Sequence, residues 1–257
     1  MLEDIKTFLW FITRPNLYPA LIDLIIRKFF LSDEDTTQKK KLALDWCEEK
    51  AISHQNLYQE LGIGQVNSFK NVIGENNYGL ISEKIQESDA DFGGPGDLDL
   101  LYNICREKNI VNAIETGVAY GWSSSAILYG ISEGNGTLVS VDMPMPKQSD
   151  YHMIGVAVQD IHQDRWKLIR KPDKYGLLEA IKLTNGPIDL IHYDSDKSYY
   201  GRKWASPIIM KHLALKGYFI SDDIEDNMFF KEFVEKNNLQ YWVTKVDNKF
   251  IGIIQKL

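Results

Sequence analysis

The chain has 257 residues, of which 44% are hydrophobic and 25% are charged, as is usual for a globular protein. Its formal net charge of −7 argues against a dedicated nucleic-acid-binding protein, which would need a basic face. No run of about 20 consecutive apolar residues occurs in the sequence, so we expect no transmembrane segment. The two cysteines, Cys47 and Cys105, are expected to be buried thiols, which favours a cytoplasmic protein.

Residues 1–92 predict an N-terminal helical extension. Residues 1–31 are expected to form two short helices that separate at Arg14 and Pro15, because proline disfavours the helical conformation of the residue before it. Charges and prolines interrupt the apolar residues of this segment. Two alternatives remain: a face packed on protein or a helix at a membrane surface. We favour packing on protein, as a lid, a substrate-binding region or a homo-oligomer interface.

The rest of the extension predicts a helical region and then a loop. Asp33 or Thr36 is expected to cap a helix, and the apolar residues of 42–61 keep helical spacing. Residues 62–78 are rich in Gly and Asn and predict a loop with at most short structure. The second domain is expected to span residues 93–257.

In the second domain, predicted helices and strands alternate, which is typical of a parallel sheet connected by helices. The expected strands are 111–115, 137–142, 166–170, 188–193 and 217–221, and the expected helices are 97–108, 122–132, 176–183, 200–213 and 227–237. Residues 241–246 and 249–255 flank a short polar turn and predict an antiparallel hairpin. The predicted fold class is therefore α/β and Rossmann-like, with a mostly parallel sheet of seven strands.

The turn after the first of these strands is the most informative motif. The strand ends at Glu115, and a turn with glycine at positions 117 and 121 leads into a helix. Glycine lets the backbone approach a bound nucleotide closely. Ala119 stands where dinucleotide-binding turns usually carry another glycine. The turn therefore favours a nucleoside without phosphates over a dinucleotide.

Acidic residues gather at the carboxyl ends of the predicted strands, where ligands of open α/β sheets bind. They follow every predicted parallel strand except 166–170: Glu115, Asp142, Asp194, Asp196, Asp222 and Asp223. Asp142 is expected to accept hydrogen bonds from ribose hydroxyls. Neighbouring carboxylates repel one another, and a hard cation such as Mg²⁺ relieves that repulsion. The alternative is that these acids cap the following helices. His192, inside a strand, is expected to be a packed core residue.

Five segments carry a resemblance to a known family: FGGPGDLDLL, ETGVAYGWSS, LVSVDMP, IDLIHYDSDKSY and GYFISDDIEDN. Together they resemble the class I S-adenosylmethionine-dependent methyltransferases, in particular the family that includes the macrocin and novobiocin-type sugar O-methyltransferases. The resemblance implies S-adenosylmethionine as cofactor. The implied cofactor-binding residues are Glu115, Gly117, Ala119, Tyr120, Gly121, Ser123, Asp142, Met143 and Asp194. Glu115 is expected to hold the positively charged methionine portion.

The resemblance also implies a metal site and a catalytic base. By motif match, Asp194, Asp222 and Asp223 would bind Mg²⁺, and Asp196 would be the general base. More distant relatives often have Asp-His where this chain has Asp196 and Lys197. Lys197 is the alternative group for orienting an acceptor oxygen.

Three hypotheses about function follow. The leading one is a Mg²⁺-dependent methyltransferase that O-methylates a hydroxyl of a small or glycosidic acceptor. The second is a metal-independent methyltransferase with another acceptor. The third, from a different class, is a non-catalytic nucleoside-binding module whose N-terminal helices recruit a partner. The intact set of acids favours an enzyme, because a degenerate site should have lost some of them.

Overall fold

The computed structural model describes residues 9–30, 36–89, 91–131, 136–144 and 151–257. Its strands are β1 (Ala51–Ile52), β2 (Asn112–Thr116), β3 (Thr137–Val141), β4 (Trp166–Ile169), β5 (Ile188–Tyr193), β6 (Leu213–Ser221), β7 (Gln240–Val246) and β8 (Lys249–Gln255). They form an eight-stranded sheet in the order β1-β7-β8-β6-β5-β2-β3-β4. Only β8 runs antiparallel to its neighbours, β6 and β7. The expected Rossmann-like fold with a C-terminal hairpin is therefore confirmed, with one strand more than expected.

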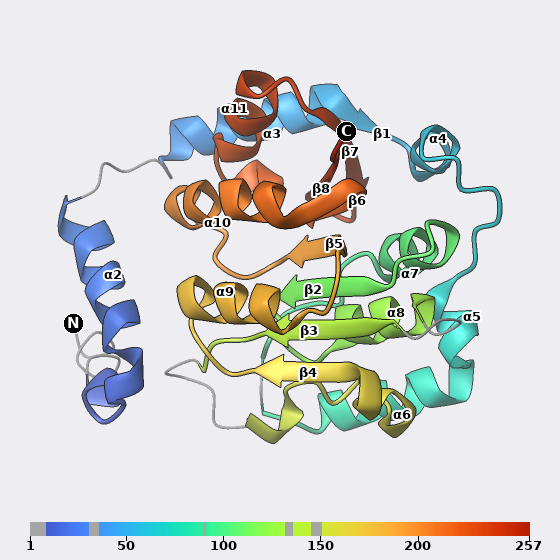
Figure 1. Ribbon diagram of the computed structural model, residues 1–257, viewed down its shortest axis with the longest axis horizontal. Coiled ribbons are helices and arrows are strands. Elements are labelled where there is room, and N and C mark those ends of the chain that lie inside the picture. Colours follow the sequence, from blue (N-terminus) through green and yellow to red (C-terminus); the bar gives the residue numbers. More distant parts are fainter. Residues whose placement is uncertain (1–8, 31–35, 90, 132–135, 145–150) are drawn as a thin grey trace.

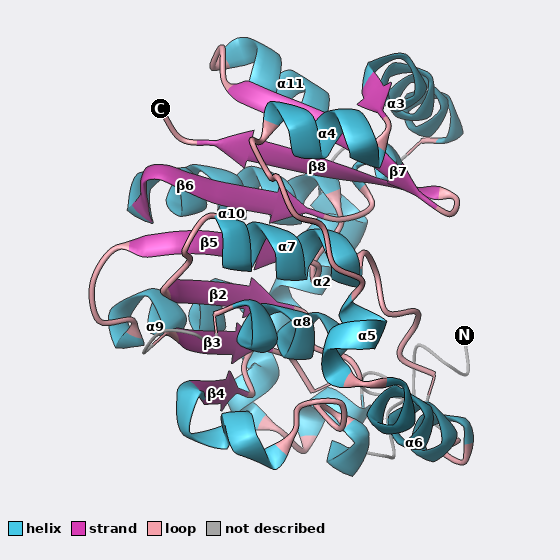
Figure 2. Ribbon diagram, turned by 90° about the vertical axis from the view of Figure 1, so that its right-hand side faces the viewer, coloured by secondary structure: helices cyan, strands magenta, loops and turns pink. Residues whose placement is uncertain are grey.

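Helices cover both faces of the sheet (Figure 1). They are α2 (Tyr18–Phe30), α3 (Thr37–Lys50), α4 (His54–Glu60), α5 (Phe69–Ile73), α6 (Glu75–Gln86), α7 (Leu98–Glu107), α8 (Trp122–Gly130), α9 (Asp173–Leu183), α10 (Tyr199–His212) and α11 (Phe229–Lys236), with short 3₁₀ helices η1 (Pro15–Leu17), η2 (Tyr151–Met153), η3 (Asp160–Arg165) and η4 (Ile224–Asp226). Buried residues of α4, α5, α7 and α8 form one apolar core, and those of α3, α9, α10 and α11 form another. Figure 2 shows α4, α7 and α8 together on one side of the sheet.

The helix expected over residues 42–61 is interrupted by the additional strand. Ala51 and Ile52 are extended and pair in parallel with β7. The Thr244 hydroxyl of β7 donates to the carbonyl of Ile52 at 3.1 Å. Ser53 then caps α4 by accepting a hydrogen bond from the backbone N–H of Asn56. Pairing with a distant strand thus overrides a local helical pattern. Strand β1 precedes residue 92 and still belongs to the sheet. The domain boundary at residue 92 stays a prediction.

The loop expected over residues 62–78 contains α5 and the start of α6. The backbone N–H of Phe69 donates to Asp99 of α7 at 2.6 Å and so starts α5. The ring of Tyr78 in α6 packs on Trp122, with 4.6 Å between centroids. None of the described side chains of α6 is fully buried. Tyr78, Ile81 and Ile85 nevertheless pack against the apolar core. Only the start of α6 falls within the residues predicted as a loop.

Helix α2 lies across the carboxyl ends of the strands (Figure 1). The predicted break is confirmed, because η1 begins at Pro15 and α2 follows it. Two ion pairs connect α2 to the sheet domain: Arg27 with Asp196 at 2.6 Å and Asp23 with Lys174 at 2.7 Å. Every helix within the described ranges is too short or too polar to cross a membrane.

The cap of α3 is Thr36, one of the two expected residues. Its hydroxyl accepts a hydrogen bond from the backbone N–H of Lys39 at 3.2 Å. Asp33, the other expected cap, lies outside the described residues. Helix α3 then packs beneath the hairpin, where Trp46 stacks on Tyr241 of β7 with 5.8 Å between ring centroids. The extension is therefore anchored on the far end of the sheet before the chain reaches β2.

Candidate functional site

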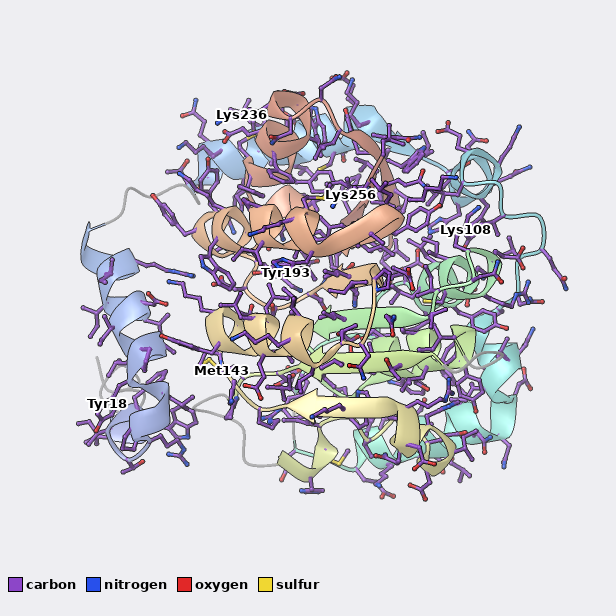
Figure 3. All side chains as sticks on the ribbon, viewed as in Figure 1. Tyr18, Lys108, Met143, Tyr193, Lys236 and Lys256 are labelled. Atoms are coloured by element: carbon purple, nitrogen blue, oxygen red, sulfur yellow. The ribbon has the colours of Figure 1, made fainter. Side chains whose placement is uncertain are left out.

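A cavity of about 620 Å³ opens at the carboxyl edge of the sheet. This volume is typical of small-molecule sites. Of the predicted site residues, the cavity is lined by Gly117, Ala119, Asp142, Met143, Asp194, Asp196 and Lys197. Figure 3 shows Met143 at the end of the sheet that faces α2, and Lys108 at the opposite end. The topology therefore brings strand-end residues and the N-terminal helix to one cavity.

The turn after β2 is held by Asp142, which follows β3. The Oδ2 atom of Asp142 accepts hydrogen bonds from the backbone N–H groups of Val118 at 2.9 Å and Ala119 at 3.2 Å. Arg170 donates to Oδ1 at 2.7 Å. Burial raises the pKa of Asp142, and these hydrogen bonds oppose that rise. Asp142 thus fixes the turn and also faces the cavity, and its expected bond to a ribose stays a prediction.

The two glycines of the turn are required by contacts within the protein. Gly117 has a φ of +85°, and a Cβ there would lie 2.3 Å from the carbonyl oxygen of Asp194. Gly121 has a φ of +83°, and its Cβ would lie 2.7 Å from the Cα of Gly155. Both glycines therefore let loops pack against one another, in addition to any role in ligand approach. Ala119 adopts a positive φ of +50° despite its side chain.

Tyr120 and Ser123 belong to the same turn and helix start without lining the cavity. The ring of Tyr120 is buried and packs on Phe92, with 4.9 Å between ring centroids. Ser123 is the second residue of α8 and is partly exposed. Their expected part in cofactor binding stays a prediction, and Tyr120 contacts the cavity through Phe92, which lines it.

Glu115 is fully buried beneath the cavity and does not line it. Its carboxylate accepts hydrogen bonds from the hydroxyls of Ser124 and of Ser140, the latter at 2.9 Å. His192 lies between two acids, 3.4 Å from Glu115 and 3.4 Å from Asp222. Burial lowers the pKa of His192, but Asp222 and Glu115 outweigh it and raise the pKa to about 10. His192 is therefore buried as expected, with an acid on either side of its ring, which was not expected.

The acids after β5 and β6 are bound by lysines. The ammonium of Lys197 lies 2.7 Å from Asp194 Oδ1 and also pairs with Asp223. Lys249 lies 3.0 Å from the other oxygen of Asp223. Burial and the neighbouring Asp222 raise the pKa of Asp194 to about 6, although Lys197 opposes the rise. Burial lowers the pKa of Lys197, but Asp194 and Asp223 outweigh it and raise that pKa.

These contacts bear on the expected metal site, which stays a prediction. Asp194, Asp222 and Asp223 have the oxygen donors that Mg²⁺ prefers. In the described part of the chain, however, no cluster of three or more His, Cys, Asp or Glu side chains is arranged to hold a metal ion. Lys197 lies between two of the expected ligands instead. The residues as arranged do not fit a dication.

Asp196, the predicted base, lines the cavity and binds two neighbours. Its Oδ2 accepts from Arg27 at 2.6 Å and its Oδ1 from the hydroxyl of Ser198 at 2.7 Å. No sequence motif indicated Arg27, because 169 positions separate it from Asp196. The pattern of residues 1–31 favoured packing on protein, as a lid, a substrate-binding region or an interface, and only the three-dimensional arrangement brings Arg27 to the site.

Two acids that were not expected at the site line the cavity, Asp23 of α2 and Asp173. No acid was expected after the strand at 166–170, yet Asp173 at the start of α9 lies in the cavity wall. It accepts hydrogen bonds from the hydroxyl of Ser195 and from the backbone N–H of Asp196, the latter at 3.2 Å. Burial raises the pKa of Asp173 to about 6. The available signal was Pro172 followed by an acid, which is typical of a helix start.

Comparison with known proteins gives one family match. Residues 114–224 match the family model of a methyltransferase domain. No protein of curated function is similar enough in sequence to match the chain. The matched segment begins within β2 and ends at the start of η4, so it includes the turn after β2 and the acids after β5 and β6.

Solved structures share the fold at low sequence identity. An O-methyltransferase from Bacillus cereus in complex with SAH is 15% identical, with a TM-score of 0.54, covering 82% of this chain and 100% of that chain. The SAH-bound Podospora anserina methyltransferase PaMTH1 is 16% identical, with a TM-score of 0.55 and coverage of 86% and 97%. The O-methyltransferase TomG from Streptomyces achromogenes, in complex with SAM, is 10% identical, with a TM-score of 0.52 and coverage of 82% and 98%.

The turn geometry gives a prediction about stability. Replacing Gly117 with alanine should lower the free energy of unfolding by about 1–3 kcal/mol, because a side chain would be strained at this φ and would clash with Asp194. Ala119→Gly is the matched control at the neighbouring positive φ, and it should change the free energy by less than about 1 kcal/mol. Urea denaturation of the wild type and both variants measures the free energy of unfolding. Equal losses in the two variants would contradict the proposed packing role of Gly117.

Proposed function

We propose that the chain, a class I S-adenosylmethionine-dependent methyltransferase, transfers a methyl group to a hydroxyl oxygen of a small acceptor. The observation that carries this proposal is the single cavity lined by the turn after β2, by Asp142 and by Asp196. A nucleoside-binding turn and a carboxylate able to accept a proton thus face the same space. A binding module would need the first of these features and would not need the second.

The cofactor part of the cavity suits an adenosine. The turn at Gly117 and Ala119 lines it, with the carboxylate of Asp142 and the apolar side chain of Met143 alongside. Glu115, Gly121 and the residues around them support the turn from beneath. S-adenosylmethionine supplies a methyl group on a sulfonium, so the protein needs to orient the reactants and manage one proton. The SAH and SAM bound to the similar structures support this assignment.

The acceptor part of the cavity is lined partly by the N-terminal extension. Phe11 and Leu24 contribute apolar surface, and Arg27 contributes a positive charge beside Asp196. We propose that a small acceptor binds here, with its hydroxyl directed to Asp196, which removes the proton during transfer. The acidic net charge of −7 supports a small molecule over a nucleic acid as substrate.

Magnesium dependence is the part of the hypothesis that the site supports least. Asp194 and Asp223 are bound by Lys197, and Asp223 is also bound by Lys249. A dication would have to displace an ammonium group before it could bind two of its expected ligands. We therefore propose methyl transfer without a metal-dependent step, which combines the hydroxyl acceptor of the leading hypothesis with the metal independence of the second.

Self-association through α2 is a further proposal. Its side chains Tyr18, Ile22, Leu24, Ile25 and Ile26 are between 40% and 54% exposed. Apolar surface gathered on one helix supports an interface with a second copy of the chain. We also propose a cytoplasmic protein, because Cys47 and Cys105 are both buried free thiols.

Asp142→Asn should weaken binding of S-adenosylhomocysteine by about 10–100-fold, because hydrogen bonds to a charged acceptor contribute about 1.5–3 kcal/mol. Asp189→Asn is the matched control. Asp189 also accepts two backbone N–H groups, from Val111 at 3.1 Å and Asn112 at 3.0 Å, at the opposite end of the strands. Isothermal titration calorimetry should show an affinity loss in the first variant only. Equal affinities for both variants would contradict the cofactor role of Asp142.

Asp196→Asn should lower kcat for methyl transfer by about 10²–10⁴-fold and leave S-adenosylhomocysteine affinity unchanged, as expected for a general base. Turnover is measured by release of S-adenosylhomocysteine with a panel of small hydroxyl compounds. Asp23→Asn is the control, because Asp23 also lines the cavity and pairs with Lys174. If Asp196→Asn keeps the wild-type kcat, the proton is removed by another group.

The double variant Ile22→Glu, Ile26→Glu should be monomeric where the wild type is oligomeric, because charged side chains resist burial in an apolar interface. Light scattering coupled to size-exclusion chromatography measures the mass. Leu215→Glu is the control, since Leu215 is 73% exposed on β6, away from α2. A monomeric wild type, or salt-resistant binding of the wild type to liposomes, would contradict the proposed interface.

A further inference from the structure

Two of the three aspartates at the carboxyl ends of β5 and β6 bind one lysine. The two strands are neighbours in the sheet, and Tyr193 pairs with Ser221 at their ends. The residues that follow, Asp194 on one strand and Asp222 on the other, are therefore forced close together. Lys197 comes three positions after Asp194, and its side chain reaches back to bind both Asp194 and Asp223.

The backbone of Lys197 is fixed by buried groups. Arg202 is 2% exposed, and its Nε donates to the carbonyl of Lys197 at 3.1 Å. The Nη2 atom of Arg202 donates to the carbonyls of Asp222 at 2.8 Å and Asp223 at 2.7 Å. Asn227 also donates to the Lys197 carbonyl, at 2.9 Å. A single buried guanidinium thus ties the backbone of Lys197 to the loop that carries Asp223, one of its two acidic partners.

Lysine side chains pair with two of the three acids near Lys197. Asp194 pairs with Lys197, and Asp223 pairs with both Lys197 and Lys249. Asp222 faces the imidazole of His192 at 3.4 Å. Two of the three acids that would bind a dication, Asp194 and Asp223, therefore already have a lysine partner. A dication entering this cluster would meet the ammonium of Lys197 at close range, and like charges there repel strongly.

We propose that Lys197 is a built-in cation that takes the place of a divalent metal ion in this site. Lys197 and Asp196 line the same cavity, so the ammonium lies beside the position of the acceptor hydroxyl. Its positive charge stabilises the negative charge that develops on the acceptor oxygen as the proton leaves. This catalytic part rests on the proposed function, whereas the exclusion of the metal does not.

The test is Mn²⁺ binding, followed by the loss of the free-ion signal in electron paramagnetic resonance. Wild type should leave added Mn²⁺ free. Lys197→Met removes the ammonium and leaves the carboxylates, so its affinity for Mn²⁺ should rise by about 10–100-fold, and adding Asp194→Asn should reverse that gain. Lys249→Met is the matched control. It removes an equal charge from Asp223 but leaves Lys197 in place, so it should not gain Mn²⁺ binding.

Two outcomes would overturn the proposal. The first is that the wild type binds one equivalent of Mn²⁺ and that Asp194→Asn weakens this binding. This comparison needs no Lys197 variant to fold. The other is a folded Lys197→Met or Lys197→Gln protein, checked by circular dichroism, that gains no Mn²⁺ affinity. S-adenosylhomocysteine binding is measured on the same wild-type sample. Its absence, together with the expected Mn²⁺ results, would refute the proposed function and leave the built-in cation standing.

Discussion

The site depends on neutralising carboxylates that the sheet topology crowds together. Parallel neighbouring strands deliver Glu115, Asp194 and Asp222 to one edge, and burial there penalises each charge. The chain supplies partners at the same edge: the imidazole of His192 within β5 and the ammonium of Lys197 just after it. Removal of Lys197 would leave Asp194 without its ion pair. The electrostatics of this edge are therefore set by residues of the protein, some of them, such as Arg27 and Lys249, distant in sequence from the acids.

Contacts between loops shape the cavity as much as the strands do. Asp142 binds the turn after β2, and Gly117 lets that turn touch the backbone at Asp194. Arg202 joins the loop after β5 to the loop after β6. The cofactor side and the acceptor side of the cavity are thus connected through backbone contacts. A substitution that moves one of these loops should therefore shift the neighbouring loops. Close backbone contact requires small residues here, and buried charged groups hold the loops together.

Much of the fold could be predicted from the sequence, because alternating apolar runs and turn residues repeat from residue 97 onward. The elements missed were those determined by distant partners. Ala51 and Ile52 form a strand only because β7 lies beside them, and α6 is held by the contact between Tyr78 and Trp122. Neither the pairing of β1 with β7 nor the contact between Tyr78 and Trp122 can be recognised from the residues next to them in the sequence. The N-terminal half of the chain was accordingly the harder part to predict.

The position of the site could be predicted from sequence, but its internal partners could not. Acids after successive strands indicated the correct edge, and Asp142, Asp194 and Asp196 do line one cavity. The sequence could not show that Glu115 lies beneath it, or that Lys197 bonds two of the expected metal ligands. Motif matching assigns positions along the chain, whereas the direction of a flexible lysine side chain depends on packing around it.

The central claim is that one chain binds the methyl donor and carries its own cation at the acceptor position. The most direct measurement is calorimetric titration of the wild-type protein with S-adenosylhomocysteine, once with Mg²⁺ and once with EDTA. The account predicts one bound molecule per chain and dissociation constants that agree within about twofold, a difference of well under 1.4 kcal/mol. Absence of binding, or binding that requires Mg²⁺, would contradict it.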